Sequence, residues 1–119
     1  MTGTAVDYSN MDKRNSNLEG ADLQKAELYK VRFEFSKFKG ANFRACKANY
    51  SCFIGADLTE ANFTGASLKG TNFSGANLTN ADFTSAKIEG AIFKDAIIKG
   101  AKFSGANIKR AKNLLIVAE

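Results

Sequence analysis

Large apolar residues recur along this chain with a strict period of five. Every fifth residue from Leu18 to Ile108 is Leu, Phe or Ile, with Ala48 as the exception, and a small residue stands two positions before each of them. A helix would place apolar residues at i, i+3, i+4 and i+7, and a strand would alternate them, so neither pattern fits. The period predicts 19 uninterrupted units of five over residues 16–110.

Each unit has two columns to bury, the large residue at position i and the small residue at position i−2. If a unit is a short extended segment followed by a turn of about 90°, four units close a square coil of 20 residues. Stacked coils then bury both columns, and the Gly found at many i+2 positions lies at a corner, where a missing Cβ lets the backbone turn. We therefore expect an all-β solenoid.

A second period of ten is superimposed on the first, because from Phe33 onward Phe occupies every second central position. With four faces per coil, a spacing of ten places Phe on two opposite faces. One ladder is Phe33, Phe53, Phe73 and Phe93, and the other is Phe43, Phe63, Phe83 and Phe103. Rings stacked at the strand spacing of roughly 4.8 Å can pack offset along the rod.

The units share the motif Ala-[Asp/Asn]-[Leu/Phe]-x-x, and in this motif the chain resembles the pentapeptide-repeat family. The motif occurs in Ala21-Asp22-Leu23, Ala41-Asn42-Phe43, Ala56-Asp57-Leu58, Ala61-Asn62-Phe63, Ala76-Asn77-Leu78 and Ala81-Asp82-Phe83. The resemblance covers about four fifths of the chain. It implies a right-handed quadrilateral β-helix of about 4.75 coils and a bacterial protein, many members being cyanobacterial.

The two flanks of the repeats differ in composition. Residues 1–15 are polar, with Val6, Tyr8 and Met11 as the substantial apolar groups, and we expect a tail or a partial cap there. Residues 111–119 are expected to cap the last coil through an apolar run. The run consists of Leu114, Leu115, Ile116 and Val117. In several members of the family such a segment also forms a dimer interface, so a monomer and a homodimer joined at this end both remain open.

Composition favours a single soluble domain in a reducing compartment. No stretch approaches the roughly 18 apolar residues of a membrane span, and residues 1–17 lack the features of a signal peptide. Cys46 occupies an inward i−2 position and Cys52 an outward i−1 position, so a disulfide between them is not expected. Free thiols suit the cytoplasm, and we predict a cytoplasmic protein without a membrane partner.

Ala48 interrupts the column of large residues. A methyl group where Leu is expected leaves a space that costs a few kcal/mol unless something fills it. Phe38 or Phe43 could fill it, which would make Ala48 a packing irregularity. The alternative hypothesis is a local bend or shallow cavity that marks a site.

The sequence offers no catalytic, metal or cofactor site. It contains no His, so imidazole triads and the usual zinc ligand sets cannot be built. The acidic residues fall at outward positions of flat faces, as at Asp57 and Glu60, whereas acid–base chemistry needs paired carboxylates in a cleft. We predict that the protein is not an enzyme and uses no cofactor.

Charge is distributed unevenly along the chain, whose net charge is +5. In two stretches, residues 36–47 and 96–112, every charged residue is Lys or Arg. Residues 48–86 between them are nearly neutral. Near the first stretch lie outward aromatic and apolar residues. The predicted interaction surface combines both sets: Tyr29, Phe35, Tyr50, Ile54, Lys37, Lys39, Arg44 and Lys47. Aromatic groups beside cations suit a protein interface or stacking with bases.

These features predict a non-enzymatic interaction module that presents a rigid rod surface to an unidentified protein partner. The alternative is a nucleic-acid-binding protein that uses the two basic stretches. The family's best-known activity, protection of DNA gyrase and topoisomerase IV by acidic dimeric rods that resemble DNA, is a weaker alternative. This chain is basic, and a DNA-binding saddle would repel it.

Overall fold

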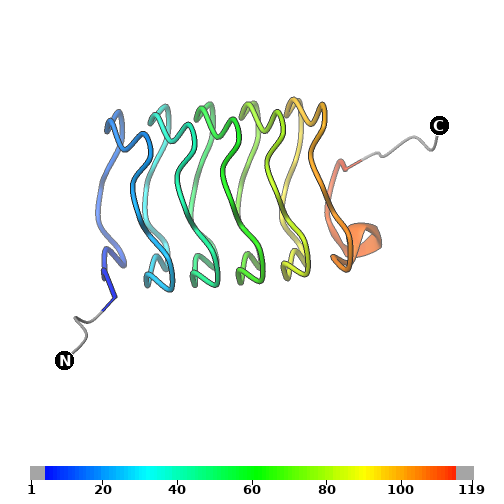
Figure 1. Cartoon of the computed structure of the whole chain (residues 1–119), viewed down its shortest axis with the longest axis horizontal. Coiled ribbons are helices and arrows are strands. Elements are labelled where there is room, and N and C mark those ends of the chain that lie inside the picture. Colours follow the sequence, from blue (N-terminus) through cyan, green and yellow to red (C-terminus); the bar gives the residue numbers. More distant parts are fainter. Residues whose placement is uncertain (1–4, 115–119) are drawn as a thin grey trace.

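The computed structural model describes residues 5–114, whose backbone winds into a stack of four-sided coils (Figure 1). Parallel bridges join residues 20 apart at the i−1 positions, from Asp7–Glu27 to Ile92–Lys112. The predicted 20-residue coil is therefore confirmed, and the fold is a right-handed quadrilateral β-helix. The bridges are isolated pairs, and the described residues contain one helix, the 3-10 helix η1 (Ile108–Arg110).

The rod has four faces, which we number by the central residues of their units. Face 1 is formed by the units of Tyr8, Leu28, Ala48, Leu68 and Ile88, and face 2 by those of Lys13, Phe33, Phe53, Phe73 and Phe93. Face 3 is formed by the units of Leu18, Phe38, Leu58, Leu78 and Ile98, and face 4 by those of Leu23, Phe43, Phe63, Phe83 and Phe103. On every face the side chains at i−1 and i+1 point outward, and i+2 forms the corner to the next face.

Backbone hydrogen bonds tie each coil to the next in a repeating pattern. The N–H of Phe63 donates to the carbonyl of Asp82 at 2.7 Å, and the N–H of Asp82 donates to the carbonyl of Ala61 at 2.9 Å. Between successive units, the N–H of Ala66 donates to the carbonyl of Phe63 at 3.0 Å and closes the corner. Because each coil satisfies the backbone groups of its neighbours, the stack is rigid along its length.

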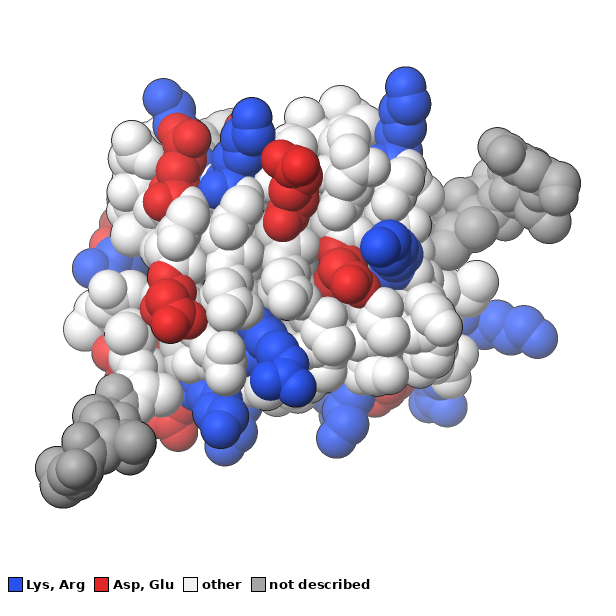
Figure 2. Space-filling model, in the orientation of Figure 1, with Lys and Arg blue, Asp and Glu red and all other residues white. Residues whose placement is uncertain are grey.

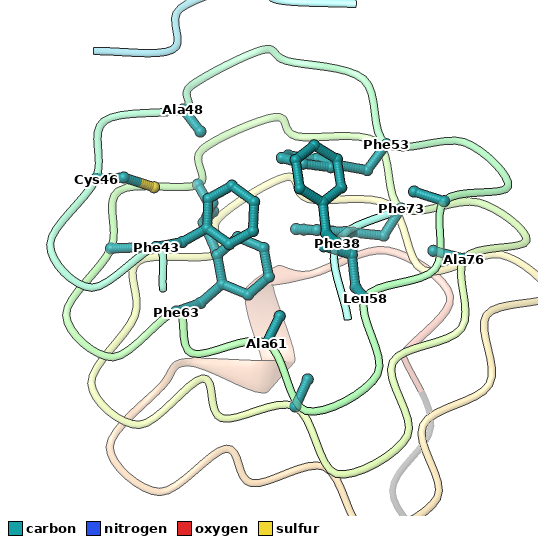
Figure 3. Close-up of a cluster of buried hydrophobic side chains, with 14 of the residues drawn as sticks. Phe38, Phe43, Cys46, Ala48, Phe53, Leu58, Ala61, Phe63, Phe73 and Ala76 are labelled. Carbon is teal, nitrogen blue, oxygen red and sulfur yellow. The ribbon is translucent and has the colours of Figure 1, made fainter. Parts of the chain in front are cut away.

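Two ladders of stacked phenylalanine rings fill the core (Figure 3), as the period of ten predicts. The ring centroids of Phe43 and Phe63 lie 4.5 Å apart at an interplanar angle of 7°, and those of Phe53 and Phe73 lie 5.3 Å apart at 10°. The two ladders meet edge to face, with the Phe63 and Phe73 centroids 5.6 Å apart at 80°. Stacked and edge-to-face rings are both favourable geometries, so the ladders brace each other.

Ala48 is fully buried, and the structure favours the packing interpretation of this irregularity. Phe38 lies on the opposite face, where later coils carry Leu58 and Leu78, and its ring points across the core toward the wall that holds Ala48 (Figure 3). Phe38 also packs edge to face on the two ladders, with its centroid 4.9 Å from that of Phe33. A larger residue on face 3 thus accompanies the smaller one on face 1.

The β-helix begins earlier than the predicted residue 16. Asp7 and Asp12 already form parallel bridges, so two further units precede Ser16 and replace most of the expected tail or partial cap. The central residues of these units are Tyr8 and Lys13, and the Lys13 ammonium lies 4.3 Å from the Tyr8 ring centroid. A lysine can cover apolar surface with its aliphatic stem while its ammonium group stays in water. A polar residue at position i hides the period of five in the sequence.

The last predicted unit, residues 106–110, departs from the square coil. η1 (Ile108–Arg110) replaces its extended segment, and the N–H of Gly90 donates to Arg110 rather than to Lys109. The bridge between Ile92 and Lys112 then restores the register. None of the described residues belongs to a helix long and apolar enough to cross a membrane.

Candidate interaction surface

The corners of the rod impose a left-handed backbone conformation on residue i+2. Phe35 and Tyr50 occupy two such corners with φ values of 60° and 62°, and both side chains are more than half exposed. Each ring lies against the glycine of the next coil. A Cβ built on Gly55 would approach the Phe35 ring to 2.5 Å, and one on Gly70 would approach the Tyr50 ring to 2.5 Å. These aromatic side chains are therefore held against glycine backbone.

The contact between Tyr50 and Gly70 can be measured by substitution. We expect Gly70→Ala to cost about 1 kcal/mol for the left-handed conformation and about 1 kcal/mol more for displacing the ring. Gly75→Ala is the matched control, because its φ is 65° and its nearest neighbour atom lies 4.0 Å away. Urea unfolding measures both costs. Equal losses of stability in the two variants would show that the ring does not rest on Gly70.

The predicted surface residues are distributed around the rod, with the aromatic and apolar ones on two adjacent faces and the basic ones on three. The structure distributes them over all four faces and their corners. Face 1 carries Tyr29, Lys47 and Tyr50. Face 2 carries Ile54, with Phe35 at its corner. Face 3 carries Lys37 and Lys39, and face 4 carries Arg44. In Figure 2 many of the Lys and Arg side chains project from the edges of the rod, and acidic side chains stand on the surface between them. Ile54 is predicted to be exposed, but in the structure it is half-buried.

Face 2 carries an ion pair that the sequence does not reveal. Glu34 is only 9% exposed although it stands at an outward position, and its Oε2 accepts a hydrogen bond from Arg32 Nη2 at 2.7 Å. Burial alone would raise the pKa of Glu34, but the bond from Arg32 keeps it below its ordinary value. Glu34 Oε1 is buried without a hydrogen-bond partner among the described residues. Cys52 lies one coil further along, bridged to Arg32.

The two thiols differ in accessibility. Cys46 is fully buried, and burial raises its pKa to about 12; Cys52 is half-buried, and burial together with the nearby Glu34 raises its pKa less. We expect iodoacetamide at pH 8 to label Cys52 slowly and Cys46 only after denaturation, because the thiolate is the reactive form. Mass spectrometry counts the labels. Labelling of the native Cys52→Ser variant would contradict the placement of Cys46.

A different group of cations comes together on face 1. Lys69 and Lys87 lie outside both basic stretches of the sequence, yet the coil brings them beside Lys47. The signal that finds them is a separation of 18 or 22 residues, because a coil of 20 makes such residues neighbours. Charge counted along the chain misses this arrangement.

The C-terminal end holds a shallow hollow beside η1. Its lining includes Lys94, Ile108, Lys109 and Leu114. Leu114 is half-buried there, whereas the rest of the predicted cap or dimer contact, Leu115, Ile116 and Val117, lies outside the described residues. Within residues 5–114 no group of three His, Cys, Asp or Glu is placed to hold a metal ion.

Comparison with family models finds a match to the model described as "Pentapeptide repeats". The match consists of eight copies in overlapping segments that together span residues 14–112. A search of curated proteins finds no match.

Solved structures of similar architecture are pentapeptide-repeat proteins. The cyanobacterial protein Rfr23 from Cyanothece 51142 is 20% identical with a TM-score of 0.55, covering 90% of this chain and 87% of its own. QnrB1, a plasmid-mediated fluoroquinolone resistance protein, is 20% identical with a TM-score of 0.61, covering 86% of this chain and 48% of its own. A thylakoid lumen protein from Arabidopsis thaliana is 31% identical with a TM-score of 0.34, covering 86% and 64%.

Proposed function

The chain belongs to the pentapeptide-repeat family, and on that premise we propose that it is a non-enzymatic protein-interaction module. The observation that carries the proposal is the outer surface of face 2 in the middle of the rod. From Cys52 to Ile92 its outward residues are uncharged. They are Cys52, Ile54, Asn72, Ser74 and Ile92. A charge-depleted centre is the compositional mark of a protein interface.

Aromatic side chains stand at the corners that border this surface. Tyr50 lies at the corner between faces 1 and 2, and Phe35 lies at the corner between faces 2 and 3. Both rings are exposed and rest on glycine, so they lose little freedom when a partner binds. Exposed aromatic residues of this kind are enriched among the residues that contribute most to binding.

The size of a face agrees with the proposal. The accessible surface of 6656 Å² is shared among four faces and two ends. One face therefore offers an area on the order of the 800 Å² that each partner buries in a standard interface. The repeated backbone bonds hold that area rigid before binding.

A pull-down from native lysate tests the proposal, with and without nuclease and at low and moderate salt. We expect a discrete protein that survives both treatments and is lost with the Ile54→Ser variant. Ile97→Ser is the matched control, because Ile97 is an exposed isoleucine on face 3. Loss of the partner with both variants, or no captured protein, would refute the role of face 2.

Fluoroquinolone resistance, the property named for QnrB1, has weaker support. The likeness at 20% identity concerns the fold, and this chain spans about half of QnrB1. A rod that acts by resembling DNA has to be acidic, whereas this chain has a net charge of +5. We therefore expect its expression to leave the fluoroquinolone susceptibility of a bacterial host unchanged.

A further inference from the structure

Face 1 carries a row of cations that the coil assembles from distant parts of the sequence. Bridges place Lys47 above Ser67 and Ser67 above Lys87 in one outward column. Lys69 stands in the neighbouring column, two residues beyond Ser67, so the lysines alternate between the two sides of the face. η1 adds the last two members at the C-terminal end. We call Lys47, Lys69, Lys87, Lys109 and Arg110 the lysine stripe.

The lysine stripe is available to a ligand. All five side chains are exposed, and neither of the two ion pairs formed among the described residues involves them. Glu89 is the one acidic residue at the outward and corner positions of face 1 between residues 46 and 110, and the acidic Glu27 lies one coil before Lys47 in the same column. From Lys47 to Arg110, five cations against one acid give this part of face 1 a positive potential, which attracts polyanions.

The spacing of the stripe suits a linear polyanion. Successive coils are about 4.8 Å apart, and two residues along a strand span about 6.6 Å, so neighbouring lysines are roughly 8 Å apart at their backbone. Flexible lysine side chains can adjust over such distances to consecutive phosphate groups. A single strand can follow this narrow row, whereas a wide duplex would contact only part of it.

Tyr50 adds an exposed aromatic ring to this basic surface. It is 56% exposed, and its N–H donates to the carbonyl of Lys69 at 2.9 Å, which fixes it beside the stripe. The Cδ1–Cε1 edge of the ring lies against Gly70, and more than half of the side chain is exposed to solvent. Tyr29 stands on the same face one coil earlier and is also exposed. Flat aromatic rings beside a basic row are the arrangement on which single-stranded bases stack.

We propose that face 1 binds single-stranded nucleic acid, with phosphates on the lysine stripe and a base stacked on Tyr50. The proposal uses the charged surface of face 1, whereas the proposed protein interaction uses the uncharged surface of face 2; Tyr50, at the corner between the two faces, is the one side chain that both share. An acidic protein segment could satisfy the charges but would gain less from a flat ring than a base does.

Binding of a fluorescently labelled oligothymidylate of about 12 nucleotides tests the proposal by anisotropy. We expect the logarithm of the affinity to fall with the logarithm of salt concentration with a slope near −3, as about four phosphate contacts to a single strand predict. The triple variant Lys47→Gln, Lys69→Gln, Lys87→Gln should weaken binding by about tenfold or more at low salt.

A second triple variant distinguishes the effect of the lysine stripe on affinity from the effect of net charge. Lys37→Gln, Lys39→Gln, Lys99→Gln removes the same charge from face 3 and should change the affinity by less than about twofold. Tyr50→Ala should weaken binding about tenfold, and Tyr50→Phe should retain it. Circular dichroism confirms that each variant keeps the wild-type fold before it is scored.

Three outcomes would overturn the proposal. The first is the absence of binding to the oligonucleotide at low salt. The second is an equal loss of affinity in the face 1 and face 3 triple variants, which would indicate attraction by net charge alone. The third is displacement of the oligonucleotide by polyglutamate at equal charge concentration, which would indicate an acidic protein ligand.

Discussion

Replacing Phe73 with aspartate is expected to unfold the middle of the rod. Phe73 is fully buried in one ladder, with its ring centroid 5.3 Å from that of Phe53 and 5.1 Å from that of Phe93. Removing a buried phenylalanine costs about 3–5 kcal/mol, and an unpaired carboxylate in the same place adds several kcal/mol. The sum is comparable to the whole stability of a domain of this size, so the variant should lack a cooperative thermal transition.

Asn72→Asp is the control for this experiment. Asn72 points outward, and its Oδ1 accepts hydrogen bonds from the Ser74 N–H at 2.9 Å and the Ser74 hydroxyl at 2.6 Å. An aspartate can accept both bonds, as Asp57 does from Thr59 on face 3. We expect a melting temperature close to that of the wild type. Similar melts for the two variants would contradict the assignment of inward and outward positions.

Phe38 and Ala48 are expected to be coupled across the core. Phe38→Ala should cost about 3–5 kcal/mol, because Ala48 opposite it has no side chain that could move into the cavity. Ala48→Leu alone should cost about 1–3 kcal/mol, because the Phe38 ring occupies the space that a larger residue would need. The double variant Phe38→Leu, Ala48→Leu restores the usual pair of aliphatic residues and should be close to the wild type in stability.

Urea unfolding of the wild type, Phe38→Leu, Ala48→Leu and the double variant Phe38→Leu, Ala48→Leu forms a double-mutant cycle. The account requires an interaction free energy of about 1–3 kcal/mol between Phe38→Leu and Ala48→Leu. Phe38→Leu with Ala66→Leu serves as the comparison, because Ala66 lies at a small i−2 position and a leucine there only overpacks. If the changes at Phe38 and Ala48 are additive, Phe38 does not fill the space beside Ala48.

The period of five predicts the fold well because every unit makes the same contacts. Once large residues recur at position i, a single geometry buries them all, so coil length, inward columns and phenylalanine ladders follow together. The prediction is inaccurate where a unit keeps the geometry but loses the apolar residue. Lys13 and Tyr8 hold central positions in the first coil, and their polar groups hide the pattern.

The surface is harder to predict, because the coil, and not the order of residues along the chain, determines which side chains are neighbours. Counting charge along the sequence groups Lys37 with Lys47, which the structure places on different faces, and leaves out Lys69 and Lys87. The burial of Glu34 depends on Arg32 and on side chains one coil away. Separations of 18 and 22 residues, which a coil of 20 makes neighbours, would have identified the lysine stripe.

Disulfide formation between Cys52 and an engineered cysteine tests most directly the claim that residues 20 apart share a face. Cys52 and Asn72 form a parallel bridge. Adjacent strands are about 4.8 Å apart, within the roughly 4.4–6.8 Å between Cα atoms that a disulfide spans. Mild oxidation of the Asn72→Cys variant should produce an intrachain disulfide with Cys52. The control variant Asn62→Cys should not, because Asn62 lies on face 4, on the opposite side of the rod from Cys52. Equal cross-linking in both variants, or in neither, would contradict the account.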